Sequence, residues 1–470
     1  MKDLFMNKKL RKIHFIGIGG ISMSALAIYC IEKGVKVSGS DRVNNLQTKK
    51  LKKLGAKIFI GHKESNIFEN CCEWEDWQCV NLKDAPDLVA YSCAIDKNNV
   101  ELKFAKNLGI KIMKRSEFMS LILNNHTHKI AVSGSHGKTT STSLIASVFI
   151  NAKINPTVFV GGETLDFGNV KIGDDNFAIF EACEYNKNFL DFPVTTSVVL
   201  NIDNDHLDCY KNIQNEVEAF KEFVNKSNVS IICADDINAK KCINKNSITY
   251  GINSNANYTA KNLIKKEKGY SFSVFREKSK LGRINLSIEG KFNVYNALVA
   301  VVVSDLYKIP FKHVKSGIES FRGVERRNQF IGKFNETPVF CDYAHHPTEI
   351  NAIINEYDKK GGKTAYVFQP HTYSRTKELK ADFVKCFSSL QNLVIYKTYS
   401  AREKYNKQGS AKTLYNDLLE VNKLFDKNIY YVQNKNQIIS TFNLLEKKVD
   451  RFLILGAGDL YDVIKKIIRK

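Results

Sequence analysis

The amino-acid sequence predicts an α/β fold divided into three domains. The chain has 470 residues, which is more than one hydrophobic core organises and suits about three domains of ordinary size. Short apolar segments alternate with amphipathic ones, as in parallel sheets whose strands are joined by crossover helices. Glycine-rich turns follow two of the apolar segments, where such folds bind phosphate groups. We expect domains at residues 1–112, 113–322 and 323–470.

The first domain begins as a strand–helix–strand unit of the Rossmann type. Residues 12–16 form an apolar strand, residues 21–33 follow a helical pattern, and residues 36–40 form the next strand. The apolar run at 13–31 follows basic residues as in a secretory signal, but glycines and serines interrupt it and a second strand follows at once. The alternation continues through a helix at 46–54 and strands at 56–60 and 88–91.

The second domain combines a mostly parallel sheet with a small antiparallel sheet, and the third is again Rossmann-like. In the second domain a strand at 129–133 leads through a glycine turn into a helix that ends near residue 151. Its other strand patterns lie at 177–181, 197–201 and 230–233, its antiparallel strands at 248–288, and its further helices at 213–224 and 294–306. The third domain has strand patterns at 339–342, 365–369, 393–396 and 452–455, with helical patterns such as 376–388 between them.

Composition and charge exclude several classes of protein. The 70 basic and 49 acidic residues give a net charge of +21, but lysines are spread evenly without an arginine-rich stripe, which indicates a basic surface rather than a nucleic-acid site. The 11 cysteines include no CxxC pair and suit a reducing compartment. No uninterrupted apolar run reaches the ~18–20 residues of a spanning helix. We therefore expect a cytoplasmic protein with no nucleic-acid partner and no membrane contact.

The first glycine-rich turn comprises Gly17, Ile18, Gly19, Gly20, Ile21 and Ser22. Glycines between a strand and a helix let the backbone approach a phosphate, and the helix N-terminus supplies amide donors. Asp41 ends the second strand, where a carboxylate could bind a ribose or a base. On these residues alone, nucleotide binding and tight glycine packing both stay open, and an NAD-dependent dehydrogenase is one alternative.

The second glycine-rich turn gives a more specific prediction, and it comprises Gly134, Ser135, His136, Gly137, Lys138, Thr139 and Thr140. A phosphate-binding loop needs glycines for curvature, a lysine for the β- and γ-phosphates and a hydroxyl for Mg²⁺. Val132 stands where the strict motif has a glycine, so the loop is a variant of that motif. We predict that it binds ATP.

Acidic residues and a histidine follow the later strands of this domain. Glu181 ends one apolar strand, and His206 follows another among Asp203, Asp205 and Asp208. The carboxyl ends of parallel strands meet at one edge of a sheet, so these side chains should gather in one crevice. Oxygen donors suit Mg²⁺, so we interpret these carboxylates as natural Mg²⁺ ligands and His206 as a further ligand.

The third domain contributes paired arginines and paired histidines. Arg326 and Arg327 could clamp a phosphate or a carboxylate. His345 and His346 precede a helix that Pro347 opens. Because neighbouring side chains diverge and no third ligand is evident, we do not expect zinc here.

Taken together, these segments resemble the Mur ligases. The resemblance runs from about residue 13 to 464, and its motifs are GIGGISMSALA, SGSD, GSHGKTT, EACEY, NIDNDHLD, NVYNA, GVERR, DYAHHPTE, FQPHTYSRT and AREK. No single motif is highly specific, whereas the order of all ten is. The family has an N-terminal domain that holds UDP, a central ATPase domain and a C-terminal Rossmann-like domain that binds the amino acid.

The resemblance is greatest to the branch that adds the first amino acid of the peptidoglycan peptide. It implies an ATP-dependent ligase that joins L-alanine to the carboxylate of UDP-N-acetylmuramate. The carboxylate would first take the γ-phosphoryl group, and the amine would then displace phosphate from the acyl phosphate. ATP and Mg²⁺ would be required, and the chain would act as a monomer or homodimer.

The resemblance also assigns roles to residues of this sequence. The substrate site would contain Gly17, Gly19, Gly20, Ser22, Ser40, Asp41, Ser92 and Ala94 for UDP, with Tyr343, His345 and Arg375 for alanine. The ATP site would contain the seven loop residues 134–140 with Asn293, Asn296, Arg327 and Asp342. The catalytic residues would be Lys138, Glu181, His206, Arg327 and His345. Thr139 and Glu181 would bind a first Mg²⁺, and His206 would bind a second.

The sequence departs from the family pattern at several positions. Phe292, Thr372 and Asn328 replace a histidine, an arginine and an aromatic residue, and residues 69–84 form an atypical insertion. Lys221 lies where sister branches carry a carbamylated lysine, and we interpret it as a surface lysine. A recycling ligase that attaches a whole tripeptide is the nearest alternative. A P-loop protein that binds nucleic acid is a further alternative, based only on the net charge.

Overall fold

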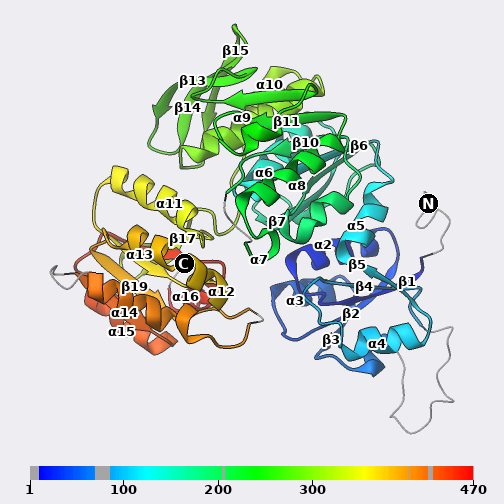
Figure 1. Cartoon of the computed structure of the whole chain (residues 1–470), viewed down its shortest axis with the longest axis horizontal. Helices are drawn as coiled ribbons and strands as arrows, with labels where there is room; N and C mark the ends of the chain where they lie inside the picture. Colours follow the sequence, from blue (N-terminus) through cyan, green and yellow to red (C-terminus); the bar gives the residue numbers. More distant parts are fainter. Residues whose placement is uncertain (1–9, 69–84, 204–206, 402, 422–426, 469–470) are drawn as a thin grey trace. The chain divides into compact units, whose positions relative to one another are not determined.

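The computed structural model describes residues 10–68, 85–203, 207–401, 403–421 and 427–468. Backbone contacts divide the chain into two compact units, residues 1–322 and residues 323–470. The first unit contains two sheets and the second unit contains one (Figure 1). The predicted three-domain α/β class is confirmed. In the described parts of the chain no helix is both long and apolar enough to cross a membrane.

The first sheet is entirely parallel, with the strand order β3-β2-β1-β4-β5. The chain moves from β1 to one side and then returns to the other, so the carboxyl end of β1 is a topological switch point. β5 runs across the predicted boundary between residues 112 and 113, and the boundaries stay a prediction. The elements are β1 (Lys12–Ile16), α2 (Ile21–Glu32), β2 (Lys36–Asp41), α3 (Leu46–Lys53), β3 (Lys57–Ile60), β4 (Leu88–Tyr91), α4 (Val100–Asn107), β5 (Lys111–Lys114) and α5 (Arg115–Leu123).

The second sheet has ten strands in the order β15-β14-β13-β12-β11-β10-β6-β9-β7-β8. The neighbouring strands from β13 through β12, β11, β10, β6 and β9 to β7 pair in parallel. At one edge β14 pairs antiparallel with β13 and with β15, and at the other edge β8 pairs antiparallel with β7. The antiparallel strands therefore extend the same sheet rather than forming a separate one. The strands are β6 (His128–Ser133), β7 (Thr157–Thr164), β8 (Gly168–Lys171), β9 (Phe177–Glu181), β10 (Thr196–Val199), β11 (Val229–Cys233), β12 (Ser247–Gly251), β13 (Tyr258–Lys265), β14 (Tyr270–Arg276) and β15 (Ser279–Leu286). The helices are α6 (Lys138–Asn151), α7 (Leu207–Tyr210), α8 (Ile213–Asn225), α9 (Phe292–Leu306) and α10 (Phe311–Glu319).

The third sheet has the order β16-β17-β21-β18-β19-β20, in which only β16 is antiparallel to its neighbour. Its strands are β16 (Gln329–Phe334), β17 (Thr337–Asp342), β18 (Thr364–Phe368), β19 (Asn392–Tyr396), β20 (Asn428–Val432) and β21 (Arg451–Leu455). Its helices are α11 (Pro347–Lys360), α12 (Tyr373–Glu378), α13 (Lys380–Phe387), α14 (Ala411–Val421), α15 (Lys435–Leu445) and α16 (Leu460–Lys465).

The first two sheets share one hydrophobic core. Phe15 and Tyr29 of the first domain belong to the same buried cluster as Phe159 and Phe180 of the second, and the rings of Tyr29 and Phe159 lie 5.9 Å apart. Asn169 of β8 donates hydrogen bonds to α2. Because this core crosses the predicted domain boundary, the two domains form one compact unit.

Candidate active site

The second glycine-rich turn connects the central strand β6 to helix α6. Gly137 is the N-cap residue of α6 and has φ +85°, a left-handed conformation that favours glycine. A Cβ atom on Gly137 would lie 2.8 Å from Oδ1 of Asn296, and one on Gly134 would lie 3.0 Å from Cβ of Leu200. Both glycines are therefore required by backbone conformation and by close packing. The first-turn amides of α6 provide an anion site of the kind that binds phosphate.

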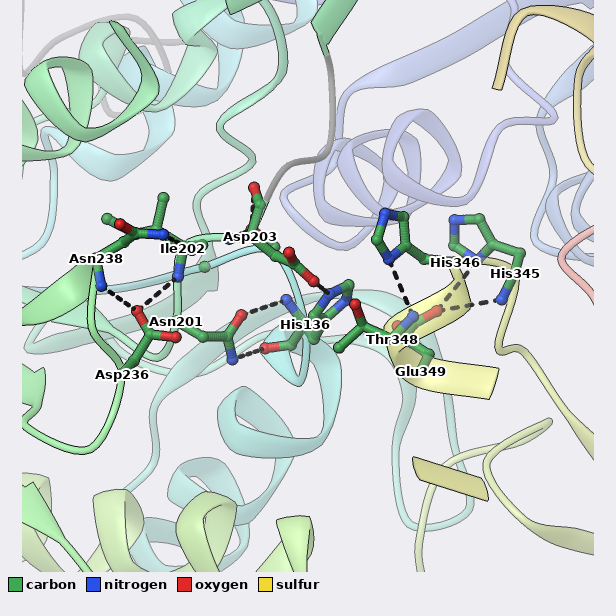
Figure 2. Close-up of polar contacts among 12 residues, drawn as sticks. His136, Asn201, Ile202, Asp203, Asp236, Asn238, His345, His346, Thr348 and Glu349 are labelled. Atoms are coloured by element: carbon green, nitrogen blue, oxygen red, sulfur yellow. Dashed lines mark hydrogen bonds and ion pairs between the residues drawn. The ribbon is translucent and has the colours of Figure 1, made fainter. Parts of the chain in front are cut away.

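Asn201, directly after β10, holds the turn in shape. Its Oδ1 accepts from the amide of His136 at 2.8 Å, and its Nδ2 donates to the carbonyl of His136 at 3.0 Å (Figure 2). Its own carbonyl accepts from the amide of Ser135. The side-chain amide of Asn201 thus pairs with the backbone of the loop, as the backbone of a neighbouring strand does in a sheet. Asn201 was not among the predicted site residues, although its place at the end of an apolar strand pattern indicates a position near the loop.

Lys138 forms the principal ion pair of the loop. Its Nζ lies 2.9 and 3.0 Å from the two carboxylate oxygens of Glu184, and it also donates to the carbonyl of Gly134. Burial lowers the pKa of Lys138, but the charges of Glu184 and its neighbours outweigh this effect and keep the pKa above its ordinary value. Lys138 is therefore held as a cation. Glu184 is fully buried and was missed, because EACEY offers two acids and only Glu181 was selected.

Two acidic groups lie beside the loop at the strand ends. An oxygen of Glu181, at the end of β9, accepts from the amide of Gly161. Oδ2 of Asp203 lies 2.9 Å from Nε2 of His136. The oxygens of Glu181 and of the buried Thr139 are hard donors at the strand and helix ends of this loop, which fits a hard cation such as Mg²⁺. His206 lies outside the described residues.

The two asparagines assigned to adenine lie on α9 and are buried. Oδ1 of Asn296 accepts from the hydroxyl of Ser141 on α6 at 3.0 Å, and its Nδ2 donates to Asn293 at 2.8 Å. This chain of hydrogen bonds attaches α9 to the first turns of α6. Phe292, one of the departures from the family pattern, is 39% exposed and lies at the start of the same helix.

The first glycine-rich turn lies at the topological switch point of the first sheet. The carbonyl of Ser40 accepts from the amides of Gly17 and Ile18, and Oδ2 of Asp41 accepts from the amide of Gly19 at 2.9 Å. A Cβ atom on Gly17 would lie 3.3 Å from Cβ of Ser92, so the turns after β1 and β4 are in contact. The structure brings together the residues that were expected to bind UDP.

The remaining three residues of that set have local partners. The amide of Gly20 donates to the carbonyl of Gly17 at 3.2 Å. Ser22 accepts a hydrogen bond from Arg115 of α5 at 3.1 Å, and the amide of Ala94 donates to the hydroxyl of Ser92 at 3.3 Å. The hydroxyl of Ser40 is buried and donates to Glu101. Glu101 was not selected from the sequence, because a glutamate in a short amphipathic helix is normally exposed.

In the second unit, predicted residues follow the carboxyl ends of β17 and β18, the two strands that flank β21, and the rings of His345 and His371 lie 5.6 Å apart. Arg327 and His345 both contact the ring of Tyr343 after β17, with a guanidinium-to-ring distance of 5.2 Å and a ring-to-ring distance of 5.5 Å. His345 also lies 3.5 Å from Glu349 (Figure 2). Arg375 of α12 lies 3.4 Å from Nδ1 of His371.

The arginine pair is divided between two functions. Arg326 lies over the rings of Tyr343 and Tyr461 and donates to the carbonyls of Gly456 and Gly458, so it fixes the turn after β21. Arg327 instead lies 3.8 Å from Glu349 and is partly exposed. Of the two guanidinium groups, the one on Arg327 is therefore the more accessible to an anion.

Asp342, at the end of β17, is a buried carboxylate. It accepts from the amides of Ala344 and Asn328 at 2.8 and 2.7 Å. Burial raises its pKa to about 6, although Arg327 and the two amides act in the opposite direction. Lys221, in contrast, lies on the surface of α8, where it donates to Glu218 at 2.9 Å.

Comparisons with known proteins agree with this arrangement. Three family models match in sequence order: the Mur ligase family catalytic domain at residues 12–127, the Mur ligase middle domain at 132–304 and the Mur ligase glutamate ligase domain at 326–458. A UDP-N-acetylmuramate–L-alanine ligase from Clostridium kluyveri is 40% identical, with 97% of each chain covered, and one from Clostridium tetani is 41% identical with the same coverage.

Solved structures share the fold. The crystal structure of a UDP-N-acetylmuramate–alanine ligase from Thermotoga maritima matches with a TM-score of 0.79 and 27% identity, covering 97% of this chain and 98% of that one. A murein peptide ligase from Psychrobacter arcticus has a TM-score of 0.71 at 21% identity, with 97% of this chain and 98% of that one covered, which shows the fold alone. The family models together span most of the chain, and the chain belongs to the Mur ligase family.

Proposed function

We propose that this protein ligates L-alanine to the carboxylate of UDP-N-acetylmuramate at the expense of ATP, an early step of peptidoglycan precursor synthesis. The observation that carries the proposal is the match at about 40% identity, over nearly the whole chain, to relatives named for this reaction. The phosphate loop with its buried Lys138–Glu184 pair supplies the chemistry that such a reaction needs.

The loop residues would bind and orient the triphosphate. The amides of the first turn of α6 and the cation of Lys138 would neutralise charge on ATP while the sugar carboxylate approaches. Mg²⁺, bound by Thr139, Glu181 and His206, would supply further neutralisation of the transferring phosphoryl group. Because two anions must meet, most of the catalysis is positioning and charge compensation.

Neither covalent step of the proposed reaction requires a nucleophile from the protein. A carboxylate oxygen bonds to the γ-phosphorus, the bond from that phosphorus to the bridging oxygen breaks, and ADP leaves. The amine of alanine then bonds to the acyl carbon, a proton is released, and phosphate departs with the acyl oxygen. Arg327 would bind the γ-phosphate, Asp342 the ribose of ATP, and Tyr343, His345 and Arg375 the incoming alanine. Asn293 and Asn296 would shape the adenine site.

The compartment and partners follow from the proposed substrates. ATP and a UDP-linked sugar are metabolites of the cytoplasm, which we infer to be the location of the protein. Its partners would be these small molecules alone, and monomer and homodimer are both compatible with the site as described.

The test is coupled phosphate release by the purified protein. With Mg²⁺, ATP and UDP-N-acetylmuramate, phosphate should appear only when an amino acid is added, and mass spectrometry should detect the matching amide. Alanine, glycine, serine and the tripeptide L-alanyl-γ-D-glutamyl-meso-diaminopimelate should be supplied in turn. Preference for the tripeptide would assign the recycling reaction instead, and phosphate release without an amide would refute the ligase assignment.

A further inference from the structure

A buried polar cluster, which we call the Glu101 cluster, lies beneath the first glycine-rich turn and consists of His14, Ser40, His62, Asn66 and Glu101. Glu101 is fully buried, as are Ser40 and His14. One carboxylate oxygen of Glu101 accepts from the hydroxyl of Ser40 at 2.5 Å, and the other accepts from Nδ2 of Asn66 at 2.5 Å. Nδ1 of His62 lies 3.2 Å from Glu101 and 3.1 Å from the hydroxyl of Ser40.

Stability alone does not explain why the Glu101 carboxylate is buried. Taking a carboxylate out of water carries a large desolvation penalty, and an apolar group of the same volume commonly gives equal or greater stability. The surrounding donors, with His14 at 3.9 Å, keep the pKa of Glu101 below its ordinary value although burial raises it. Glu101 therefore stays an anion and acts as a strong hydrogen-bond acceptor for Ser40.

Ser40 transmits this constraint to the turn. Its side chain points to Glu101, while its carbonyl accepts from the amides of Gly17 and Ile18 at 2.8 and 3.0 Å. The next residue, Asp41, accepts from the amide of Gly19. The glycine turn and α2 are thus held against the end of β2 by a residue whose own side chain is fixed by Glu101.

We infer that Glu101 is a positioning residue for the UDP end of the substrate, acting through Ser40 on the glycine-rich turn without touching the ligand. This inference rests on the proposed function, which uses the same turn to bind UDP-N-acetylmuramate. The Ser40 hydroxyl likewise supports the turn from within the protein and does not contact the ligand, because it is buried and already donates to Glu101.

The primary experiment compares Glu101→Gln with the unaltered enzyme in steady-state kinetics. The KM for UDP-N-acetylmuramate should rise about tenfold, the change expected when a hydrogen bond to a charged group is lost, while kcat and the KM for ATP stay the same. Ser40→Ala should raise the same KM. The double variant should show no further increase, because both changes remove one coupled interaction.

Asp87→Asn provides the matched control. The Asp87 carboxylate accepts from the amides of Arg11 and Lys12 at 2.7 and 2.8 Å, at the opposite end of β1 from the glycine turn. Its loss should lower the stability of the same domain and leave every KM unchanged.

Three results would overturn the inference: a KM within twofold of the unaltered enzyme for Glu101→Gln, an equal change in the KM for ATP, or strictly additive effects in the double variant. If Glu101→Gln lacks a cooperative unfolding transition, the test rests on Ser40→Ala. An unchanged KM for UDP-N-acetylmuramate in Ser40→Ala would then contradict the inference. An unaltered enzyme that forms no amide refutes the proposed function instead. Calorimetric titration with UDP then still tests Glu101, and equal affinity of the two proteins for UDP would contradict the inference.

Discussion

Lys138 and Glu184 show how one residue pair links stability to chemistry. The ammonium is held by both oxygens of a carboxylate that is fully buried, so each charge depends on the other. Removing one partner of a buried ion pair leaves an uncompensated charge, which costs far more than the pair itself contributes. Substitution of Lys138 is therefore expected to lower stability as well as activity.

Lys138→Ala should lower turnover by at least about 100-fold, since it removes a cation from the site of charge transfer. It should also lower the free energy of unfolding by about 3–5 kcal/mol, because Glu184 loses its lysine partner. Adding Glu184→Gln should restore most of the stability and none of the activity. Urea unfolding and phosphate release measure the two effects separately.

Lys221→Ala is the control for that experiment, since this lysine pairs with Glu218 on the surface of α8. It should change neither stability nor turnover. Near-normal turnover in Lys138→Ala would contradict the loop assignment, and a loss of turnover in Lys221→Ala that depends on bicarbonate would indicate a carbamylated lysine.

Asp235, after β11, gives a prediction of pH dependence. Its carboxylate accepts from the hydroxyl of Ser254, from the amides of Ile252, Asn253 and Ser254, and from the hydroxyl of Tyr295. Burial raises the pKa of Asp235, but these donors outweigh it and lower the pKa from the ordinary 3.8 to about 2. A lowered pKa stabilises the fold above the unfolded value, and this contribution is lost as the pH falls from about 4 through about 2.

Asp235→Asn should therefore lower the free energy of unfolding at pH 7 by about 1 kcal/mol, because the weakened hydrogen bonds are to a charged group that is only partly buried. The difference between variant and unaltered protein should persist at pH 5 and shrink at pH 3. Urea unfolding at the three pH values checks this, and a difference that is independent of pH would exclude the carboxylate charge as its source.

At the level of elements, the start of α6 depends on a glycine in two ways. Gly137 has a positive φ, and a Cβ atom there would meet Asn296 at 2.8 Å. Gly34, after α2, has a similar φ of +80° with no atom within 4 Å of such a Cβ. The two positions therefore separate backbone strain from steric conflict.

Gly34→Ala should cost only the left-handed strain of about 1–2 kcal/mol and leave activity unchanged. Gly137→Ala should cost more and should also raise the KM for ATP, because the contact pushes α9 away from the loop. Thermal unfolding and steady-state kinetics of both variants test this. Equal losses of stability in the two variants, with an unchanged KM for ATP, would show that only the positive φ matters and the contact with Asn296 does not.

At the level of the whole molecule, the distribution of buried residues predicts which fragments fold. In the described part of the second unit, two apolar clusters are composed only of its own residues. The largest cluster of the first unit instead joins its first two domains, and the first domain has only a small cluster of its own among the described residues. A fragment of residues 323–470 should unfold cooperatively by itself, whereas a fragment of residues 1–112 should not. Circular dichroism during urea unfolding of both fragments checks this, and a cooperative transition in the shorter fragment would contradict the shared core.

The fold class, the family and the chemical type of each motif follow from the amino-acid sequence alone. Apolar runs and glycine turns depend on neighbouring residues and on the periodicity of strands and helices, so β1, β6 and α6 were predictable to within a few residues. The resemblance to the Mur ligases is confirmed by the three family models.

Which residues of those motifs face each other depends on how the chain folds. Glu184 rather than Glu181 pairs with Lys138, and Arg326 supports a turn while Arg327 stays accessible. Glu101 is buried although it lies in a short amphipathic helix. These outcomes depend on contacts between segments far apart in the chain, and burial sets their energies. A local sequence pattern indicates neither the long-range contacts nor the burial of a side chain. A glutamate in water needs no protein partner, whereas a buried glutamate needs several hydrogen-bond donors to offset its desolvation.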